Sequence, residues 1–334
     1  MHRQSQIKRS VSNSLYRPRN IGQSIILLPF LFGKARTMAA IEASTTVTTP
    51  IRKRKKKHII LRSIGWFFKL VIALVILSLL ATISFIWWTP PRTSYMMQSG
   101  EPVVYQYVSI DHISRYVLAA TIAHEDQELG TRPGAFDIEA FNARAKAYIE
   151  GKPDPSGSTI PQQLAKNIFL TPQQNAVRKG IEAGLATEFS LILSEERILE
   201  LYLNYAQFGP KLYGICAATW YYFGNPPWNI TEYQAAQLMG VLPLPNLVQR
   251  AKDGGIYLGP VVNFRVWDYV NGAANVHVPR QIEGMGGWKA AVATIGITDT
   301  AADHANERGS ADSCSAMPSS VLDRIKQEDS TWKP

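Results

Sequence analysis

The sequence predicts a mostly α-helical domain that follows a single membrane-spanning helix. Two observations lead to this prediction: an uncharged apolar run near the N-terminus, and helical spacing of apolar residues through most of the remaining chain. The chain has 334 residues, of which 46% are hydrophobic, so it is long enough to bury a substantial core. These properties exclude a disordered protein.

Positive charge is concentrated at the N-terminal end. The formal net charge is +9, but residues 1–57 carry 13 Lys and Arg against one acid, Glu42, and the remainder carries 22 basic and 25 acidic residues. A nucleic-acid groove would need basic residues spread over the folded body. We therefore expect a membrane partner and no nucleic acid.

The basic run at 52–57 lies directly before the apolar segment 64–88. Residues 70–88 carry no charge, and a helix of that length spans a hydrocarbon core of about 30 Å. By the positive-inside rule, residues 1–63 are expected to be a basic cytoplasmic tail and 64–88 a signal-anchor helix of the inner membrane, with the rest in the periplasm. A cleaved signal peptide is the alternative, but it would have a shorter apolar region and a small-residue cleavage site.

The exported part is expected to divide into three segments. Residues 89–112 are predicted to be an extended linker with a short strand near Val103 to Tyr107, residues 113–275 the folded domain, and residues 276–334 a poorly ordered tail. Cys216 and Cys314 do not make a disulfide framework or show metal-ligand spacing, and Cys216 is interpreted as a small core residue.

Within 113–275, apolar residues recur at helical spacing in successive stretches that begin near polar N-cap residues. The stretches are Ile113 to Ile122, Ile138 to Ile149, Leu164 to Phe169, Val177 to Ile192, and Ile198 to Tyr205. Candidate caps are Ser158 or Thr159, Ser194, and the capping boxes Thr171 to Gln174 and Thr231 to Gln234, the last on a helix that ends before Pro243.

Three groups of polar residues in the helical domain could carry chemistry. Glu125 and Asp126 stand at a helix end before a Gly/Pro turn, where a carboxylate can reach the lip of a cleft. A polar stretch comes next along the chain: Ser158, Thr159, Gln162, Gln163, Lys166 and Asn167. Arg178 and Lys179 both flank Glu182 on a helix, which suits a pyrophosphate beside an ionised carboxylate. Taken alone, Glu125 and Asp126 are better explained as solvated charges. The polar stretch is also compatible with a capped surface helix, and the charged group with an ordinary ion-pair cluster.

Together, in this order, the motifs resemble those of the peptidoglycan glycosyltransferase family, and most closely its monofunctional biosynthetic transglycosylases. The matching residues fall between about 90 and 250: Glu125, Asp126, Gly134 and Asp137; Ser158 to Asn167; Arg178, Lys179 and Glu182; Ile198 to Asn204 with Gly209, Gly214 and Ala218 to Phe223; Ala235, Ala236, Pro243 and Pro245. Leu129, Arg132, Pro161 and Ser190 depart from the family pattern, which bears on the geometry of the substrate loop and would suit a slow or specialised enzyme.

The resemblance implies a lysozyme-like glycosyltransferase domain that polymerises lipid II into β-1,4-linked glycan strands, inverting the anomeric carbon and releasing undecaprenyl pyrophosphate. In this interpretation Glu125 is the general base and Lys166, Arg178 and Lys179 stabilise the leaving group. Glu182 would orient these cations or help to hold Mg²⁺ or Mn²⁺, and no organic cofactor is expected. Asp126, Ser158, Thr159, Gln162, Gln163 and Asn167 would bind substrate.

The expected partners are lipid II, the growing lipid-linked strand, the membrane, and proteins of cell-wall synthesis and division. No Lys-Thr-Gly triplet occurs, so a penicillin-binding transpeptidase domain is not predicted. Two alternatives stay open: a lytic transglycosylase, which cleaves glycan with one Glu, and a non-catalytic membrane scaffold of the cell-wall machinery.

Overall fold

The computed structural model describes residues 55–152, 157–173 and 175–332, so the expected cytoplasmic tail up to residue 54 lies outside the described residues. The chain separates into two units, residues 1–58 and 59–334, and the folded domain belongs to the second. Its described residues are mostly helical, with one small antiparallel sheet of β1 (Gln207–Gly209) and β2 (Leu212–Tyr213). The predicted α-helical class is confirmed.

Helix α1 (Lys55–Ser84) contains the apolar segment Ile60–Ser84, which is long and apolar enough to cross a membrane. An α-helix satisfies its backbone hydrogen bonds internally, which a lipid environment requires. The helix begins before residue 64 and ends before Trp87 and Trp88, which lie in and after a turn. The predicted span is therefore present, with bounds shifted toward the N-terminus.

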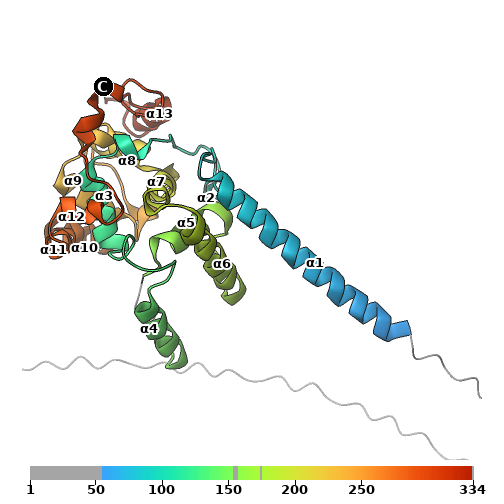
Figure 1. Ribbon diagram of the computed structural model, residues 1–334. Coiled ribbons are helices and arrows are strands. Elements are labelled where there is room, and N and C mark those ends of the chain that lie inside the picture. The colour runs from blue at the N-terminus through green and yellow to red at the C-terminus, as the bar shows by residue number, and fades with distance from the viewer. Residues whose placement is uncertain (1–54, 153–156, 174, 333–334) are drawn as a thin grey trace, which may run out of the picture. The chain divides into compact units, whose positions relative to one another are not determined.

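Helix α3 (Arg115–Glu125) is the central element of the domain. It packs against α9 (Glu232–Val241), α11 (Val278–Gly284) and α12 (Trp288–Ala293), which lie together with it in Figure 1. The predicted apolar stripe is confirmed: Ile113, Val117, Leu118 and Ile122 are all fully buried. Each such side chain contributes about 1.5–3 kcal/mol through burial, so the end of α3 is firmly held.

A second group of helices consists of α5 (Ile160–Phe169), α6 (Ala176–Ile192) and α7 (Glu195–Tyr205), with α5 packed on both others. Thr159 and Ser194 occupy the predicted N-cap positions of α5 and α7. The predicted start of α6 at Thr171 is wrong. Asn175 is its N-cap, and its side chain accepts a hydrogen bond from the backbone N–H of Arg178, as expected of a strong capping residue.

Two predictions for the connecting elements need correction. Helix α4 (Ile138–Ile149) has the expected bounds, but Ile138 and Ile149 are 66% and 84% exposed, so they do not form a buried stripe. The expected linker contains α2 (Ser94–Ser99) and the 3-10 turn η1 (Ile110–His112), and its predicted strand is reduced to an isolated bridge between Val104 and Leu212.

The remaining elements before residue 278 are short. They are α8 (Ile215–Phe223), η2 (Pro227–Asn229), η3 (Pro245–Leu247), α10 (Phe264–Gly272) and the π-helical turn η4 (Ala273–His277). Helix α9 has the predicted capping box of Thr231 and Gln234 and ends before Pro243. A Cβ on Gly240 would lie 2.6 Å from the carbonyl oxygen of Tyr269, so this glycine permits the close packing of α9 on α10.

The predicted poorly ordered tail is wrong. Residues 276–332 form α11, α12, the 3-10 helix η5 (Ala301–Glu307) and α13 (Ser319–Glu328), and α13 buries Val321 and Ile325. A disulfide joins Cys314 to Cys216 on α8, a pairing that the sequence does not predict. Cys216 is buried in the core, as expected. The sequence signal was weak because α11 and α12 span only 7 and 6 residues, too few to show a helical period.

Candidate active site

Glu125 lies at the C-terminal end of α3, half-buried, with one carboxylate oxygen held in place. The Nε2 of Gln163 donates to its Oε2 at 2.8 Å, and the hydroxyl of Tyr202 donates to the same oxygen at 3.4 Å. Burial, followed by the nearby charge of Glu125, raises the pKa of Tyr202 well above its usual value, so Tyr202 stays a donor. Oε1 makes no hydrogen bond to the described residues.

Asp126 has both of its oxygens engaged by the protein. Arg132 pairs with it through two hydrogen bonds of 2.6 and 2.9 Å, and the backbone N–H of Ile160 donates to Oδ2 at 3.0 Å. The paired side chains are almost fully buried. Arg132 is one of the departures from the family pattern, and its pair with Asp126 connects the end of α3 to the start of α5. We infer that Asp126, predicted to bind substrate, positions these two elements.

The polar stretch on α5 divides into two sets. Thr159 donates to the carbonyl oxygen of Ala135 at 2.7 Å, and Gln162 completes the capping box by accepting from the backbone N–H of Thr159 at 3.1 Å. Asn167 is buried and donates to the carbonyl oxygen of Tyr205 at 3.5 Å. These three predicted substrate-binding residues therefore stabilise the helix and its surroundings.

The other three residues of the stretch are Ser158, Gln163 and Lys166. They interact with Glu125, with Glu182, or with the Lys179 that pairs with Glu182. Lys166 lies over the ring of Tyr95, with its Nζ 5.9 Å from the ring centroid. Burial lowers the pKa of Lys166, and the positive charges of Lys179 and Arg178 lower it further, while Glu182 and Glu125 oppose the shift. Lys166 thus interacts electrostatically with two of the three carboxylates that the sequence singled out, Glu125 and Glu182.

Glu182 is 1% exposed and lies among cations. Lys179 forms an ion pair with its Oε1, and Arg178 lies 3.2 Å from its Oε2. With Lys166 nearby, three positive charges face one carboxylate, so the cluster retains positive charge. The Nε atom of Arg178 is buried without a hydrogen-bond partner among the described residues, whereas Nη1 faces Glu182 in the ion pair.

A continuous chain of hydrogen bonds connects Glu125 to this cationic cluster of Lys166, Arg178 and Lys179. Gln163 Nε2 donates both to Glu125 and, at 2.9 Å, to the carbonyl oxygen of Ser158. The hydroxyl of Ser158 accepts from Lys179 at 3.2 Å, and Lys179 in turn pairs with Glu182. The structure therefore brings the carboxylate of Glu125 and a cationic cluster into one site.

Comparison with known proteins identifies the family. The transglycosylase family model matches residues 93–256, which contain the whole site. The biosynthetic peptidoglycan transglycosylases of Marinomonas sp. (strain MWYL1) and Shewanella frigidimarina (strain NCIMB 400) are each 42% identical to this chain, over 155 and 156 residues. These matches cover 46% and 47% of this chain and 68% and 69% of the relatives. The chain belongs to the peptidoglycan transglycosylase family.

The relative from Shewanella oneidensis is 36% identical over 191 residues, which is 55% of this chain and 82% of that protein. Family membership makes the chain a glycosyltransferase of peptidoglycan synthesis with a lysozyme-like domain. The family model ends at residue 256, so the C-terminal helices lie beyond it.

Sequence reasoning missed three residues of this transglycosylase site. Tyr202 was placed in a motif but given no role, although it contacts Glu125 and also donates to Gln163 at 3.3 Å. Tyr95 lies in the expected linker, and no pattern there indicates its contact with Lys166. The sequence identifies Arg132 only as a departure from the family pattern, although a basic residue close after Asp126 can form an ion pair with it.

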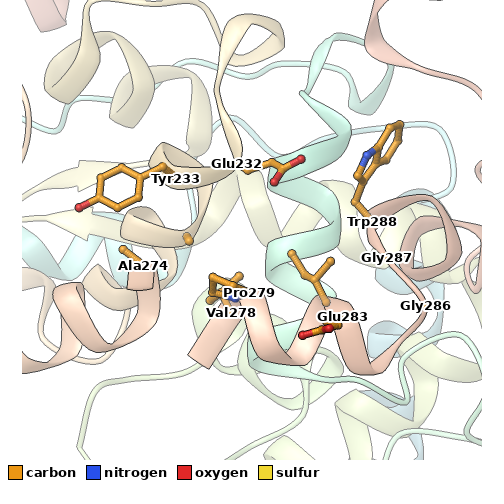
Figure 2. A pocket seen from close by; sticks show the side chains of 11 residues that line it. Glu232, Tyr233, Ala274, Val278, Pro279, Glu283, Gly286, Gly287 and Trp288 are labelled. Atoms are coloured by element: carbon orange, nitrogen blue, oxygen red, sulfur yellow. The ribbon is translucent and has the colours of Figure 1, made fainter. Parts of the chain in front are cut away.

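A separate pocket of about 680 Å³ lies between α9, η4, α11 and the start of α12 (Figure 2). Its walls include Ala274, Val278 and Trp288, with the carboxylates of Glu232 and Glu283 among the lining residues. None of the motif residues that carry the proposed chemistry lines it, so it is distinct from the transglycosylase site.

Proposed function

We propose that this transglycosylase polymerises lipid II into β-1,4-linked glycan strands and releases undecaprenyl pyrophosphate. The observation that carries the proposal is the hydrogen-bonded chain from Glu125 through Gln163 and Ser158 to Lys179. It sets a candidate base and a candidate leaving-group site at a fixed separation, which a two-substrate transfer needs.

In the proposed reaction, the acceptor 4-hydroxyl oxygen attacks the anomeric carbon while its proton passes to Oε1 of Glu125. The bond from that carbon to the pyrophosphate oxygen breaks on the opposite face, so the configuration inverts. Lys166, Arg178 and Lys179 stabilise the charge that develops on the leaving oxygen, and Glu182 keeps these cations in place. Ser158 and Gln163 fix the position of Glu125 relative to Lys179.

The fit of a divalent metal to Glu182 is poor. Mg²⁺ prefers several oxygen ligands, but each oxygen of Glu182 already faces a cation, and among the described residues no second carboxylate shares a metal cluster with it. We infer that Mg²⁺ or Mn²⁺ would join this site only together with pyrophosphate oxygens of the substrate. No step of the proposed reaction depends on a metal.

We further propose that α1 anchors the enzyme in the inner membrane, with the catalytic domain in the periplasm. The C-terminal end of α1 lies against the elements of the site: Ser78 donates to Glu188 on α6 at 2.9 Å, and Phe85 packs against Phe169 and Phe189. This contact would keep the site near the lipid-linked substrates. The Cys216–Cys314 disulfide fits an oxidising compartment outside the cytoplasm.

The deciding experiment is incubation of the detergent-solubilised full chain with purified lipid II, comparing the wild type with Glu125→Gln. We expect the variant to bind lipid II but to polymerise it at least about a hundredfold more slowly, which is the scale of lost general-base catalysis. Glu139→Gln, at an exposed position on α4, is the matched control and should leave the rate unchanged. A Glu125→Gln variant with near wild-type activity would exclude this base.

Two other results would redirect the assignment. Release of soluble muropeptides from isolated sacculi, without polymerisation, would identify a lytic enzyme. If the wild type shows neither activity although it is folded, the scaffold alternative holds.

A further inference from the structure

A second cluster of chemically active side chains lies where the C-terminal segment meets the beginning of the domain. Asp111 on η1 and His304 and Glu307 on η5 each offer a ligand atom, and these three atoms lie within 4.8 Å of one another. None of them belongs to the transglycosylase site. Asp111 makes no hydrogen bond or ion pair with any residue that the structure describes.

The imidazole of His304 is oriented as metal-binding histidines usually are. Its Nε2 lies 2.6 Å from Oδ2 of Asp299, whereas Nδ1 faces Glu307 at 3.5 Å. Arg115, which is almost fully buried, donates to Oδ1 of Asp299 at 3.0 and 2.7 Å and fixes that carboxylate. A carboxylate that accepts from one ring nitrogen leaves the other nitrogen as a lone-pair donor for a metal.

The surroundings carry an excess of negative charge. Glu196 on α7 interacts electrostatically with Asp111, Glu200, Asp299 and Arg115, and Glu307 lies beside Asp111, so carboxylates outnumber cations among these described residues. Such a set attracts a divalent cation more strongly than a single exposed acid does.

A buried nitrogen beside the cluster also lacks a partner. The ring of His112 is 3% exposed, and its centroid lies 6.2 Å from that of His304. Its Nδ1 makes no hydrogen bond to the described residues. An unpaired buried polar atom is costly, and a metal-bound water or a small ring movement toward the ion would satisfy it.

We propose that Asp111, His304 and Glu307 form a zinc site, and that Asp299 orients His304 through the contact of its Oδ2 with Nε2. One imidazole nitrogen and two carboxylates suit Zn²⁺, with water in the remaining position, whereas Mg²⁺ prefers oxygen ligands alone. His304 and Glu307 lie beyond the segment that the family model matches, and Asp111 lies inside it. The ion would therefore fasten the C-terminal segment to the glycosyltransferase domain.

The test uses the full chain in detergent, purified through a tag without histidine and stripped with EDTA. Isothermal titration with ZnCl₂ should show one bound equivalent, Zn²⁺ should raise the melting temperature, and MgCl₂ should do neither. His304→Ala should abolish both effects, and Glu307→Gln should weaken binding at least tenfold. Glu307 is 63% exposed, so its variant is expected to fold.

The matched control is His277→Ala, because His277 is exposed and lies outside the cluster. It should bind zinc as the wild type does. The competing explanation is a metal-free cluster in which a protonated His304 pairs with Asp299 and Glu307. Absence of stoichiometric zinc binding by the wild type, or equal binding by His304→Ala, would overturn the zinc site in favour of that explanation.

Discussion

At the scale of single residues, the transglycosylase site contains a buried cation, Lys166, whose placement lowers the free energy of unfolding. Lys166 has no hydrogen bond or ion pair from its side chain to the described residues, and it lies near Arg178 and Lys179, so burial and these charges lower its pKa. A charged group kept in such a place costs free energy in the unliganded protein. An arriving pyrophosphate would remove that cost by supplying opposite charge.

Lys166→Met should therefore separate stability from activity. Because the cation is removed and the stem is kept, we expect an unchanged or higher melting temperature, together with polymerisation reduced by roughly 10², the scale of one lost preorganised donor. Circular dichroism melts and lipid II assays measure the two effects. Lys146→Met, on α4, should alter neither. A less stable but fully active Lys166→Met would instead show a structural role.

The pH dependence of this stability difference follows from the direction of the shift. Since the pKa of Lys166 is lower in the folded state, the unfolded state binds more protons between the folded and unfolded values, and wild-type stability rises with pH there. The advantage of Lys166→Met should be largest near neutral pH and shrink as pH rises toward the unfolded pKa of about 10.4.

At the scale of elements, the sequence predicted helices that combine a long apolar period with a clear cap. Helix α7 fits this description, with its cap at Ser194 and its buried face where expected. The buried face of α3 and the capping box of α9 are also where the sequence predicts them. The start of α6 was missed because Thr171 and Asn175 both offer a capping side chain, and local pattern does not decide between them. The sequence does not reveal the structural hydrogen bonds of Thr159 and Asn167, because the residues that accept them, Ala135 and Tyr205, are distant in sequence.

One contact between elements bears directly on Glu125. The turn after α3 passes so close to the C-terminal segment that a Cβ on Gly130 would lie 2.1 Å from the backbone oxygen of Thr294. His124, next to Glu125, also contacts Gln281 on α11 at 3.1 Å. The C-terminal segment thus packs against the end of α3 and helps to fix the position of Glu125.

Gly130→Ala should disturb the packing of the turn after α3 against Thr294. A backbone shift is unavoidable, so we expect a loss of about 1–3 kcal/mol in the free energy of unfolding, as in overpacked cores, and reduced polymerisation through displacement of Glu125. Chemical denaturation and activity assays provide the measurements. Gly184→Ala is the control: its Cβ would meet nothing within 4 Å, and in a helix it should stabilise by up to about 1 kcal/mol. Equal behaviour of the two variants would contradict the close contact.

At the scale of the whole molecule, the C-terminal segment is part of the domain, although its sequence gives little sign of it. Tyr221 on α8 donates to Glu328 on α13 at 2.6 Å, and Arg324 lies over the Tyr221 ring. The disulfide from Cys216 to Cys314 spans 98 positions of sequence, and two cysteines so far apart give no pairing signal of their own. Such a link stabilises mainly by restricting the unfolded chain.

Replacing both cysteines by alanine should therefore destabilise the domain without altering the transglycosylase site. For a closed loop of this length we expect a loss of about 2–5 kcal/mol, measured by urea titration of tryptophan fluorescence on the full chain in detergent. The wild type unfolded in the presence of dithiothreitol provides the matched control. It should lose the same amount, whereas the reductant should leave the double variant unaffected. Two free thiols in the oxidised wild type, or coincident urea midpoints for oxidised wild type and double variant, would show that the bond does not hold the C-terminal segment in place.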